Sequence, residues 1–155
     1  MNPAPCFYCT DEYKDYMQEI CRLDTSTVFL HNEQEYPGRC IVVLNDHKTE
    51  LFQLSPAQRA SYMDSVAAVA QAVHRLFNPV KINYAVYGDI DSHIHFHVVP
   101  KHHHSKNWGM PFEVTTGQDR QKFLTPQEYQ DRIDLIRSAL RDIMHKSPPA
   151  AQSTD

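Results

Sequence analysis

The segment from His93 to Pro100 constrains the fold of this chain more than any other stretch of its sequence. It reads His-Ile-His-Phe-His-Val-Val-Pro, so that His93, His95 and His97 alternate with apolar residues. In an extended strand, successive side chains point to opposite faces and each residue advances about 3.3 Å. The pattern therefore predicts a strand over residues 93–99, with three imidazoles side by side on one face and apolar side chains buried on the other.

The imidazole row has a functional interpretation. A ring that is removed from water needs a hydrogen-bond partner, a metal ion or a bound ligand. Three rings that titrate near neutral pH are costly to keep in one row for packing alone. We therefore interpret this face of the strand as a binding or catalytic surface.

The composition limits the class of protein. The chain has 155 residues, of which 41% are hydrophobic, and this suits one soluble domain with short tails. Its 15 Lys and Arg against 19 Asp and Glu give a net charge of -4, so we expect no nucleic-acid partner. No segment has the roughly 20 apolar residues of a membrane span, and the first residues lack a signal pattern. We therefore predict no membrane partner and a cytoplasmic location.

Two segments have the apolar spacing of amphipathic helices. The first begins at Ser55-Pro56-Ala57-Gln58, where Ser55 and Gln58 can form a capping box, and it ends at Asn78-Pro79. The second begins at Thr125-Pro126-Gln127-Glu128 and ends before residue 147. We expect a single domain over residues 1–146 and a flexible tail over 147–155.

Strand patterns fill the rest of the chain. They lie at about residues 17–23, 27–31, 39–44, 80–87 and 93–99. The unbroken apolar run in 39–44 is typical of a central strand. Because strands and helices are not strictly alternating, the order predicts an α+β fold, in which an antiparallel sheet of about five strands carries two main helices on one face.

The alternating histidine motif resembles that of the histidine triad (HIT) superfamily. The Tyr36-Pro37-Gly38 turn and the order of strands and helices are similar to the same superfamily. Pro100-Lys101, followed by Trp108-Gly109-Met110-Pro111, resembles a short-loop bacterial branch of it. The resemblance implies a HIT-like domain that pairs as a homodimer and acts on the α-phosphate of a nucleotide.

Carried over to this sequence, the resemblance makes His95 the nucleophile, with His97 and His93 in contact with the phosphate. A neutral imidazole is a good nucleophile near neutral pH, and neighbouring rings can donate hydrogen bonds to phosphoryl oxygens. The implied function is a nucleotidyl hydrolase or transferase that forms a covalent nucleotidyl-histidine. Dinucleoside polyphosphates and nucleoside phosphoramidates are the implied substrates, and the chemistry needs no cofactor.

Five further residues are candidates for substrate binding. His31 and Asn32 end a predicted strand where members of the superfamily contact the ribose. Arg39 follows the Pro-Gly turn in place of a histidine, and it binds phosphate or forms an ion pair with Glu35. Asn83 or Tyr87 borders the histidine face if their strand pairs with the histidine strand. Trp108 stacks on a base, crosses to a dimer partner or packs in the core.

The Cys6-Phe7-Tyr8-Cys9 segment has the spacing of half a zinc site. Zinc in the uridylyltransferase branch of the superfamily implies a structural Zn²⁺ held by Cys6, Cys9, His47 and His93. The alternative is a surface Cys-x-x-Cys with His47 as an ordinary loop residue. If zinc binds His93, only His95 and His97 remain for chemistry. All four cysteines are expected as thiols or metal ligands rather than disulfides.

The sequence leaves two alternative functions to weigh. The chain could be a non-catalytic nucleotide-binding module that senses its ligand. A catalytic metal site in a barrel is disfavoured by the two long helices.

The adjoining His102, His103 and His104 are either an exposed loop or a source of positive charge near bound phosphate.

Overall fold

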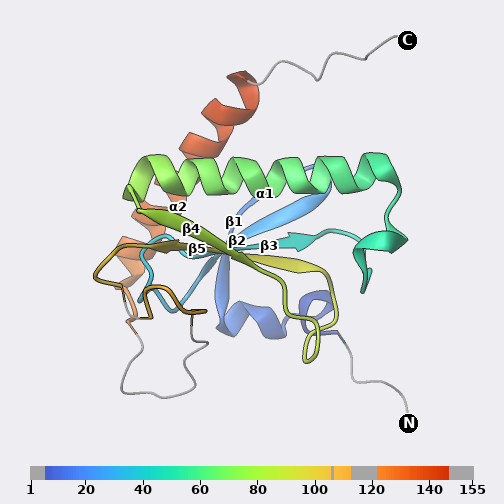
Figure 1. Cartoon of the computed structure of the whole chain (residues 1–155), viewed down its shortest axis with the longest axis horizontal. Coiled ribbons are helices and arrows are strands. Elements are labelled where there is room, and N and C mark those ends of the chain that lie inside the picture. The colour runs from blue at the N-terminus through green and yellow to red at the C-terminus, as the bar shows by residue number, and fades with distance from the viewer. Residues whose placement is uncertain (1–5, 106, 113–121, 147–155) are drawn as a thin grey trace.

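Five antiparallel strands form one sheet, in the order β1-β2-β3-β5-β4 (Figure 1). The structure is a computed structural model, and it describes residues 6–105, 107–112 and 122–146. The predicted tail over 147–155 lies outside these residues. Each predicted strand is present with ends that differ by at most two residues, the bounds being β1 Met17–Arg22, β2 Ser26–His31, β3 Cys40–Leu44, β4 Lys81–Ala85 and β5 His95–Lys101.

Two long helices cover the same face of the sheet, as Figure 1 shows for α1 (Pro56–Phe77) and α2 (Pro126–Lys146). The main core lies between them and the sheet. It joins strand residues such as Val42 and Phe96 to helix residues such as Tyr62 and Ile136. The Tyr62 hydroxyl also donates to the Val42 carbonyl at 2.8 Å. The predicted α+β class and the placement of both helices on one face are therefore confirmed.

The helix boundaries follow from local capping. Ser55 Oγ accepts from the Gln58 amide at 3.2 Å while Gln58 Oε1 accepts from the Ser55 amide at 3.0 Å, which completes the predicted capping box. Asn78 ends α1 in the left-handed conformation, with φ 44°. The amide and hydroxyl of Thr125 both donate to Glu128 at the start of α2.

The opposite face of the sheet carries a smaller second layer that the sequence analysis did not predict. Two short 3-10 helices, η1 (Phe7–Cys9) and η2 (Glu12–Asp15), lie against it; a third, η3 (Leu51–Gln53), precedes α1. A buried cluster on this face comprises Met17, Phe29, Ile41 and Val43, and Phe7, Tyr8 and Tyr13 pack on that cluster. The N-terminal segment thus covers part of the histidine face.

The histidine strand begins at His95, so the prediction that it includes His93 is wrong. β5 pairs with β3 in a register that places His95 opposite Val43 and His97 opposite Ile41. Before His95 the pairing becomes irregular, because the Ile94 amide donates to the Lys48 carbonyl at 2.9 Å. Only His95 and His97 therefore project from regular strand.

The turn before β3 depends on a glycine and a buried amide. Gln34 Nε2 donates to the carbonyls of His31 and Arg39, and Gln34 Oε1 accepts from the Gly38 amide at 2.9 Å. Gly38 has φ 88°, and a Cβ atom there would lie 2.5 Å from the Phe77 ring. A side chain at this position would be strained by its backbone and would also collide with the end of α1.

We expect Gly38→Ala to lower the free energy of unfolding by about 2–4 kcal/mol, from the combined left-handed strain and overpacking. Gly88→Ala is the matched control, because nothing lies within 4 Å of a Cβ at Gly88. Denaturant unfolding of both variants measures the difference. Equal stabilities of the two variants would contradict this account of the turn.

Candidate functional site

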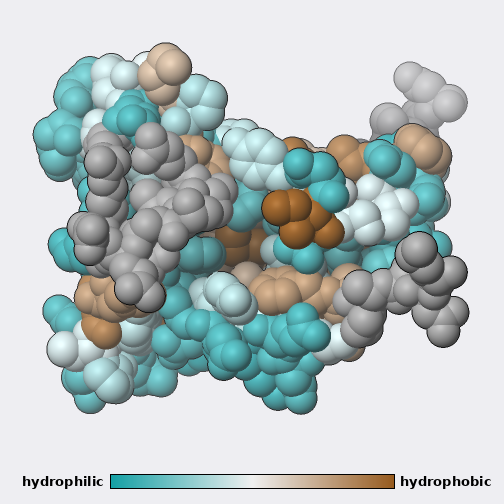
Figure 2. Space-filling model, turned by 90° about the horizontal axis from the view of Figure 1, so that it is seen from below, coloured by the Kyte–Doolittle hydropathy of each residue, from teal (hydrophilic) through white to brown (hydrophobic). Residues whose placement is uncertain are grey.

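A cavity of about 630 Å³ lies on the histidine face of the sheet. This volume is in the range of about 300–1,000 Å³ typical of small-molecule sites. Figure 2 views this face, and apolar surface fills a central hollow bordered by polar side chains. The cavity is lined by Phe7, Tyr8, Tyr16, Met17, His31, Arg39, Ile41, Tyr87, Asp89, Ile90, Asp91, His95 and His97.

His95 is held in one orientation by its own chain. Its Nδ1 lies 2.7 Å from the carbonyl oxygen of His93, so Nδ1–H donates to that oxygen. The proton on Nδ1 leaves the lone pair on Nε2, the other ring nitrogen of this cavity-lining side chain. Burial lowers the pKa of His95, and the bond to His93 opposes this effect. The Tyr8 ring packs against the imidazole at 4.8 Å between centroids.

His97 is buried to nine-tenths and lines the same cavity. Its Nδ1 has no hydrogen-bond partner among the described residues, and its ring lies 5.2 Å from that of His95. Burial and, secondly, the charge of Arg39 lower the pKa of His97 to about 3. His97 is therefore a neutral imidazole near pH 7, with a ring nitrogen that is free to bind a ligand.

Arg39 pairs with Glu33, so the ion pair with Glu35 considered from the sequence is wrong. Arg39 Nη1 lies 3.3 Å from Glu33 Oε2, and both side chains are at most 6% exposed. The Glu35 amide donates to the other oxygen of the Glu33 carboxylate, and this bond helps to hold the carboxylate beside the guanidinium. Arg39 Nε has no partner among the described residues. The guanidinium thus keeps one donor in the cavity wall, and Glu33 is a site residue that the sequence did not reveal.

His31 lies at the end of β2 and lines the cavity as predicted. His31 Nδ1 lies 3.1 Å from the Glu33 amide nitrogen and 3.2 Å from the Glu33 carbonyl oxygen, so the Glu33 backbone holds the ring through this nitrogen. Burial and then Arg39 lower the pKa of His31 to about 4. Asn32, predicted beside it, does not line the cavity. Its side chain donates to the Asp15 carbonyl at 3.0 Å and accepts from Gln18, because the start of β1 lies beside the end of β2.

Asn83 and Trp108 lie outside the histidine cavity. Asn83 pairs with Val99 on the histidine face but lines two neighbouring cavities beyond Tyr87. Trp108 borders one of these cavities, and its ring contacts that of His103 at 4.5 Å. The pairing of β4 with β5 was predicted, but it carries Tyr87 rather than Asn83 to His97, at 5.8 Å between ring centroids.

Several cavity residues were not assigned from the sequence. Tyr8 lies between Cys6 and Cys9 in the chain. A metal cluster that joins these cysteines to His47 and His93 would therefore place Tyr8 near the histidines. Asp89, Ile90 and Asp91 lie in the loop between β4 and β5. Their only signal was proximity to His93 in the chain, which does not fix the direction of a loop.

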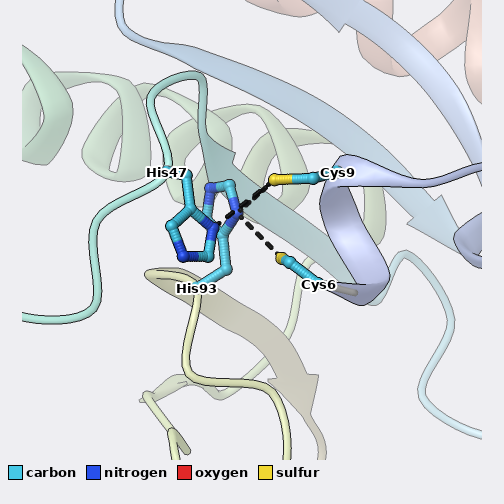
Figure 3. Close-up of side chains that lie close together, drawn as sticks. All are labelled: Cys6, Cys9, His47 and His93. Carbon is cyan, nitrogen blue, oxygen red and sulfur yellow. Dashed lines mark hydrogen bonds between the residues drawn. The ribbon is translucent and has the colours of Figure 1, made fainter. Parts of the chain in front are cut away.

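The structure brings the four predicted zinc ligands together. Figure 3 shows the side chains of Cys6, Cys9, His47 and His93 converging, from η1 and its preceding residue and from the loops that follow β3 and precede β5. Their donor atoms all lie within 4.8 Å of one another. All four cysteines of the chain are free thiols.

The spacing of these donors suits a tetrahedral ion. Cys6 Sγ and Cys9 Sγ lie 3.4 and 3.6 Å from His93 Nδ1, and Cys9 Sγ lies 3.4 Å from His47 Nδ1. Ligand edges of a tetrahedral zinc with sulfur and nitrogen donors are about 3.3–3.8 Å. His93 Nε2 donates to the Leu44 carbonyl at 2.7 Å, which leaves Nδ1 with a lone pair that faces the sulfurs. Two thiols and two imidazoles are a donor set typical of structural zinc.

A protein-family model identifies the family to which this chain belongs. The model of the HIT domain matches residues 14–104, which include both β3 and the whole histidine motif. The chain belongs to the HIT family. The HIT fold implies nucleotide binding with hydrolase or transferase activity, and the matched segment contains His31, Arg39, His95 and His97 of the cavity.

Solved structures agree with this fold. A histidine triad protein from Bradyrhizobium japonicum has a TM-score of 0.76 at 20% identity, with 88% of this chain and 99% of that chain covered. A zinc-bound histidine triad protein from Mycobacterium smegmatis has a TM-score of 0.60 at 19% identity, with 92% and 97% covered. For the diadenosine triphosphate hydrolase of Plasmodium falciparum the TM-score is 0.58 at 15% identity, with 80% and 76% covered.

No curated protein matches this HIT chain in sequence. Within the described residues, neither α1 nor α2 nor any shorter helix combines the length and apolar character that crossing a membrane requires.

Proposed function

We propose that this HIT protein is a nucleotidyl hydrolase or transferase that attacks a nucleotide α-phosphate with His95. One observation carries the proposal. His95 Nδ1 is tied to the His93 carbonyl, and the ring lines a cavity large enough for a nucleotide. A nucleophile needs a fixed direction and a free lone pair, and this tautomer provides both.

In the first step, the Nε2 lone pair of His95 forms a bond to the α-phosphorus and the bond to the leaving group breaks. The leaving group departs with the electron pair of the broken bond and takes up a proton. His97 and Arg39 donate hydrogen bonds to the non-bridging phosphoryl oxygens, since each has a buried nitrogen without another partner among the described residues. His93 holds the nucleophile through its carbonyl and does not touch the phosphate.

In the second step, water or another acceptor attacks the same phosphorus and the phosphorus–nitrogen bond breaks. The electron pair returns to Nε2, and the acceptor loses one proton. The mononucleotide leaves, and His95 is again a neutral imidazole that keeps its bond to the His93 carbonyl. Attack by water gives hydrolysis, and attack by another nucleophile gives transfer.

The apolar wall of the cavity is suited to the nucleoside. Phe7, Tyr8 and Met17 offer flat or flexible apolar surface against which a base can pack. His31, whose Nδ1 is held by the Glu33 backbone, offers Nε2 for a hydrogen bond with a ribose hydroxyl. Asn32, Asn83 and Trp108 take no part in this arrangement within one chain.

We expect His95→Asn to lower turnover by about a thousandfold or more, because removal of a covalent nucleophile leaves only binding and oxyanion stabilisation. The assay is a panel of adenosine and guanosine phosphoramidates, dinucleoside polyphosphates and nucleotide sugars, read out as released mononucleotide. Acid-quenched wild-type protein should carry a nucleotide on His95, detected by peptide mass spectrometry.

His104→Asn is the matched control, since His104 is exposed outside the cavity. Undiminished turnover by His95→Asn would contradict the assignment. Binding of nucleotides without conversion of any substrate would favour the non-catalytic sensing module.

We also propose that Cys6, Cys9, His47 and His93 bind a structural zinc ion. The donor distances and the hydrogen bond from His93 to Leu44 support this site. A bound Zn²⁺ would cross-link the N-terminal segment to the loops on either side of the histidine strand. It would add stability to the fold without entering the reaction.

Metal analysis of protein purified without a histidine tag should find about one zinc per chain. Cys6→Ser should lose the metal and unfold at a temperature several degrees lower. Cys21→Ser, which changes a half-buried thiol outside the cluster, should retain both properties. Wild-type protein without stoichiometric zinc would refute the proposal.

We propose a homodimer formed through β4. This strand is one of the two outer strands of the sheet, the other being β1, so one side of its backbone has no neighbouring strand in the described chain. Val80, Tyr84 and Val86 on and beside it are about half exposed. An apolar edge of this kind is completed when a second copy pairs with it.

Light scattering should therefore give a mass of two chains for the wild type and of one chain for Tyr84→Glu. Phe52→Glu, which changes an even more exposed ring on η3, should remain dimeric. A wild-type mass of one chain would exclude this interface.

A further inference from the structure

The two walls of the histidine cavity differ in chemistry. One wall comes from the N-terminal segment and β1, and its members Phe7, Tyr8, Tyr16 and Met17 are apolar or aromatic. The other wall comes from the loop between β4 and β5, where two carboxylates, Asp89 and Asp91, lie beside Tyr87 and Ile90. Among the described lining residues of this cavity, carboxylates therefore come from this loop alone.

The phosphoryl subsite lies on the floor between these walls. Two nitrogen atoms there are buried and have no partner among the described residues, His97 Nδ1 and Arg39 Nε. Buried polar atoms without partners are rare, and both of these belong to side chains that line the cavity. They mark the place where an anionic group completes the hydrogen bonding.

The charges around that subsite do not suit a polyphosphate. Arg39 is the only lysine or arginine among the described lining residues, and Glu33 already pairs with it at 3.3 Å. His31 and His97 are neutral near pH 7, because burial lowers their pKa values. A leaving group with several negative charges would thus face Asp89 and Asp91 with no free cation to offset the repulsion.

We propose that Asp89 and Asp91 select a positively charged leaving group, so that the preferred substrates are nucleoside phosphoramidates of cationic amines such as diamines. This inference rests on the proposed function and names its substrate class. The nucleoside occupies the apolar wall, the phosphoryl group lies over His95 and His97, and the amine extends toward the loop. Asp89 and Asp91 determine specificity by their charge and take no covalent part in the reaction.

The reaction balances for such a substrate. His95 Nε2 bonds to phosphorus, and the phosphorus–nitrogen bond of the substrate breaks. The amine leaves with that electron pair and gains one proton, and in water it takes up a second proton to become an ammonium ion. Water then cleaves the bond to His95 and gives the mononucleotide. The carboxylates favour both the remote cation of the substrate and the ammonium product.

Three substrates that differ only in a remote charge test the inference. They are adenosine monophosphate joined through a phosphorus–nitrogen bond to diaminopentane, to pentylamine and to aminopentanoate, with the guanosine series in parallel. We expect kcat/KM to fall in the order cationic, neutral, anionic. Each step should be about three- to fivefold, the scale of an exposed ion pair. The preference should shrink at high salt, because Asp89 is exposed.

Variants assign the preference to the two carboxylates. Asp89→Asn and Asp91→Asn should each reduce the ratio of cationic to neutral kcat/KM by about three- to fivefold. Asp89→Lys should reverse the order of the three substrates and raise the turnover of a dinucleoside polyphosphate. Asp64→Asn, which removes a carboxylate from the exposed side of α1, should leave every ratio unchanged.

The possible failures are distinguishable. Release of the three amines at equal rates, or ratios that Asp89→Asn and Asp91→Asn do not change, would overturn the inference and leave the nucleotidyl transfer intact. Release of none of the amines, with no nucleotide bound covalently to His95, would overturn the proposed function and this inference with it. Faster turnover of the aminopentanoate derivative by the wild type would show the opposite charge preference and would also overturn the inference.

Discussion

The pairing of β3 with β5 is the contact on which the rest of this protein depends. It sets His95 beside Val43 and His97 beside Ile41, while the alternate residues of both strands enter the core beneath α1 and α2. A slip of one residue would exchange Phe96 with a histidine and place an imidazole in that core. Because the cost of such a slip is large, the burial of the apolar side chains also fixes the chemical face of the sheet.

His93 connects two parts of the molecule that have different roles. Its ring belongs to the Cys/His cluster, and its carbonyl orients the His95 ring. Tyr8, held between Cys6 and Cys9, packs on the rings of both histidines. The N-terminal segment therefore sets the position of the nucleophile as well as one wall of the cavity, and a metal ion in the cluster would strengthen both.

The electrostatics of the cavity follow from burial rather than from net charge. Removal from water keeps His31 and His97 neutral, and it makes the pair of Arg39 with Glu33 necessary, since an unpaired guanidinium would be costly to bury. Among the described residues that line the cavity, the exposed charge is that of Asp89. A protein with a modest overall charge can thus place a carboxylate at the mouth of a neutral cavity.

The sequence alone determined the features that depend on local pattern. These are the alternation of the histidine strand, the capped helices and the strand positions within two residues. Each follows from a periodicity or a cap that neighbouring residues carry. The meeting of Cys6, Cys9, His47 and His93 was implied by the resemblance to the superfamily and by no local pattern, because His47 and His93 are distant from the cysteines in the chain. Tertiary structure decided which side chains meet across the fold. Glu33 rather than Glu35 faces Arg39, and His93 leaves the strand, because the turn and the loop before β5 bend in ways that no periodic pattern records. The same reason explains which residues from distant parts of the chain line the cavity. Tyr8, Tyr87, Asp89 and Asp91 line it, whereas Asn32, Asn83 and Trp108 lie outside it.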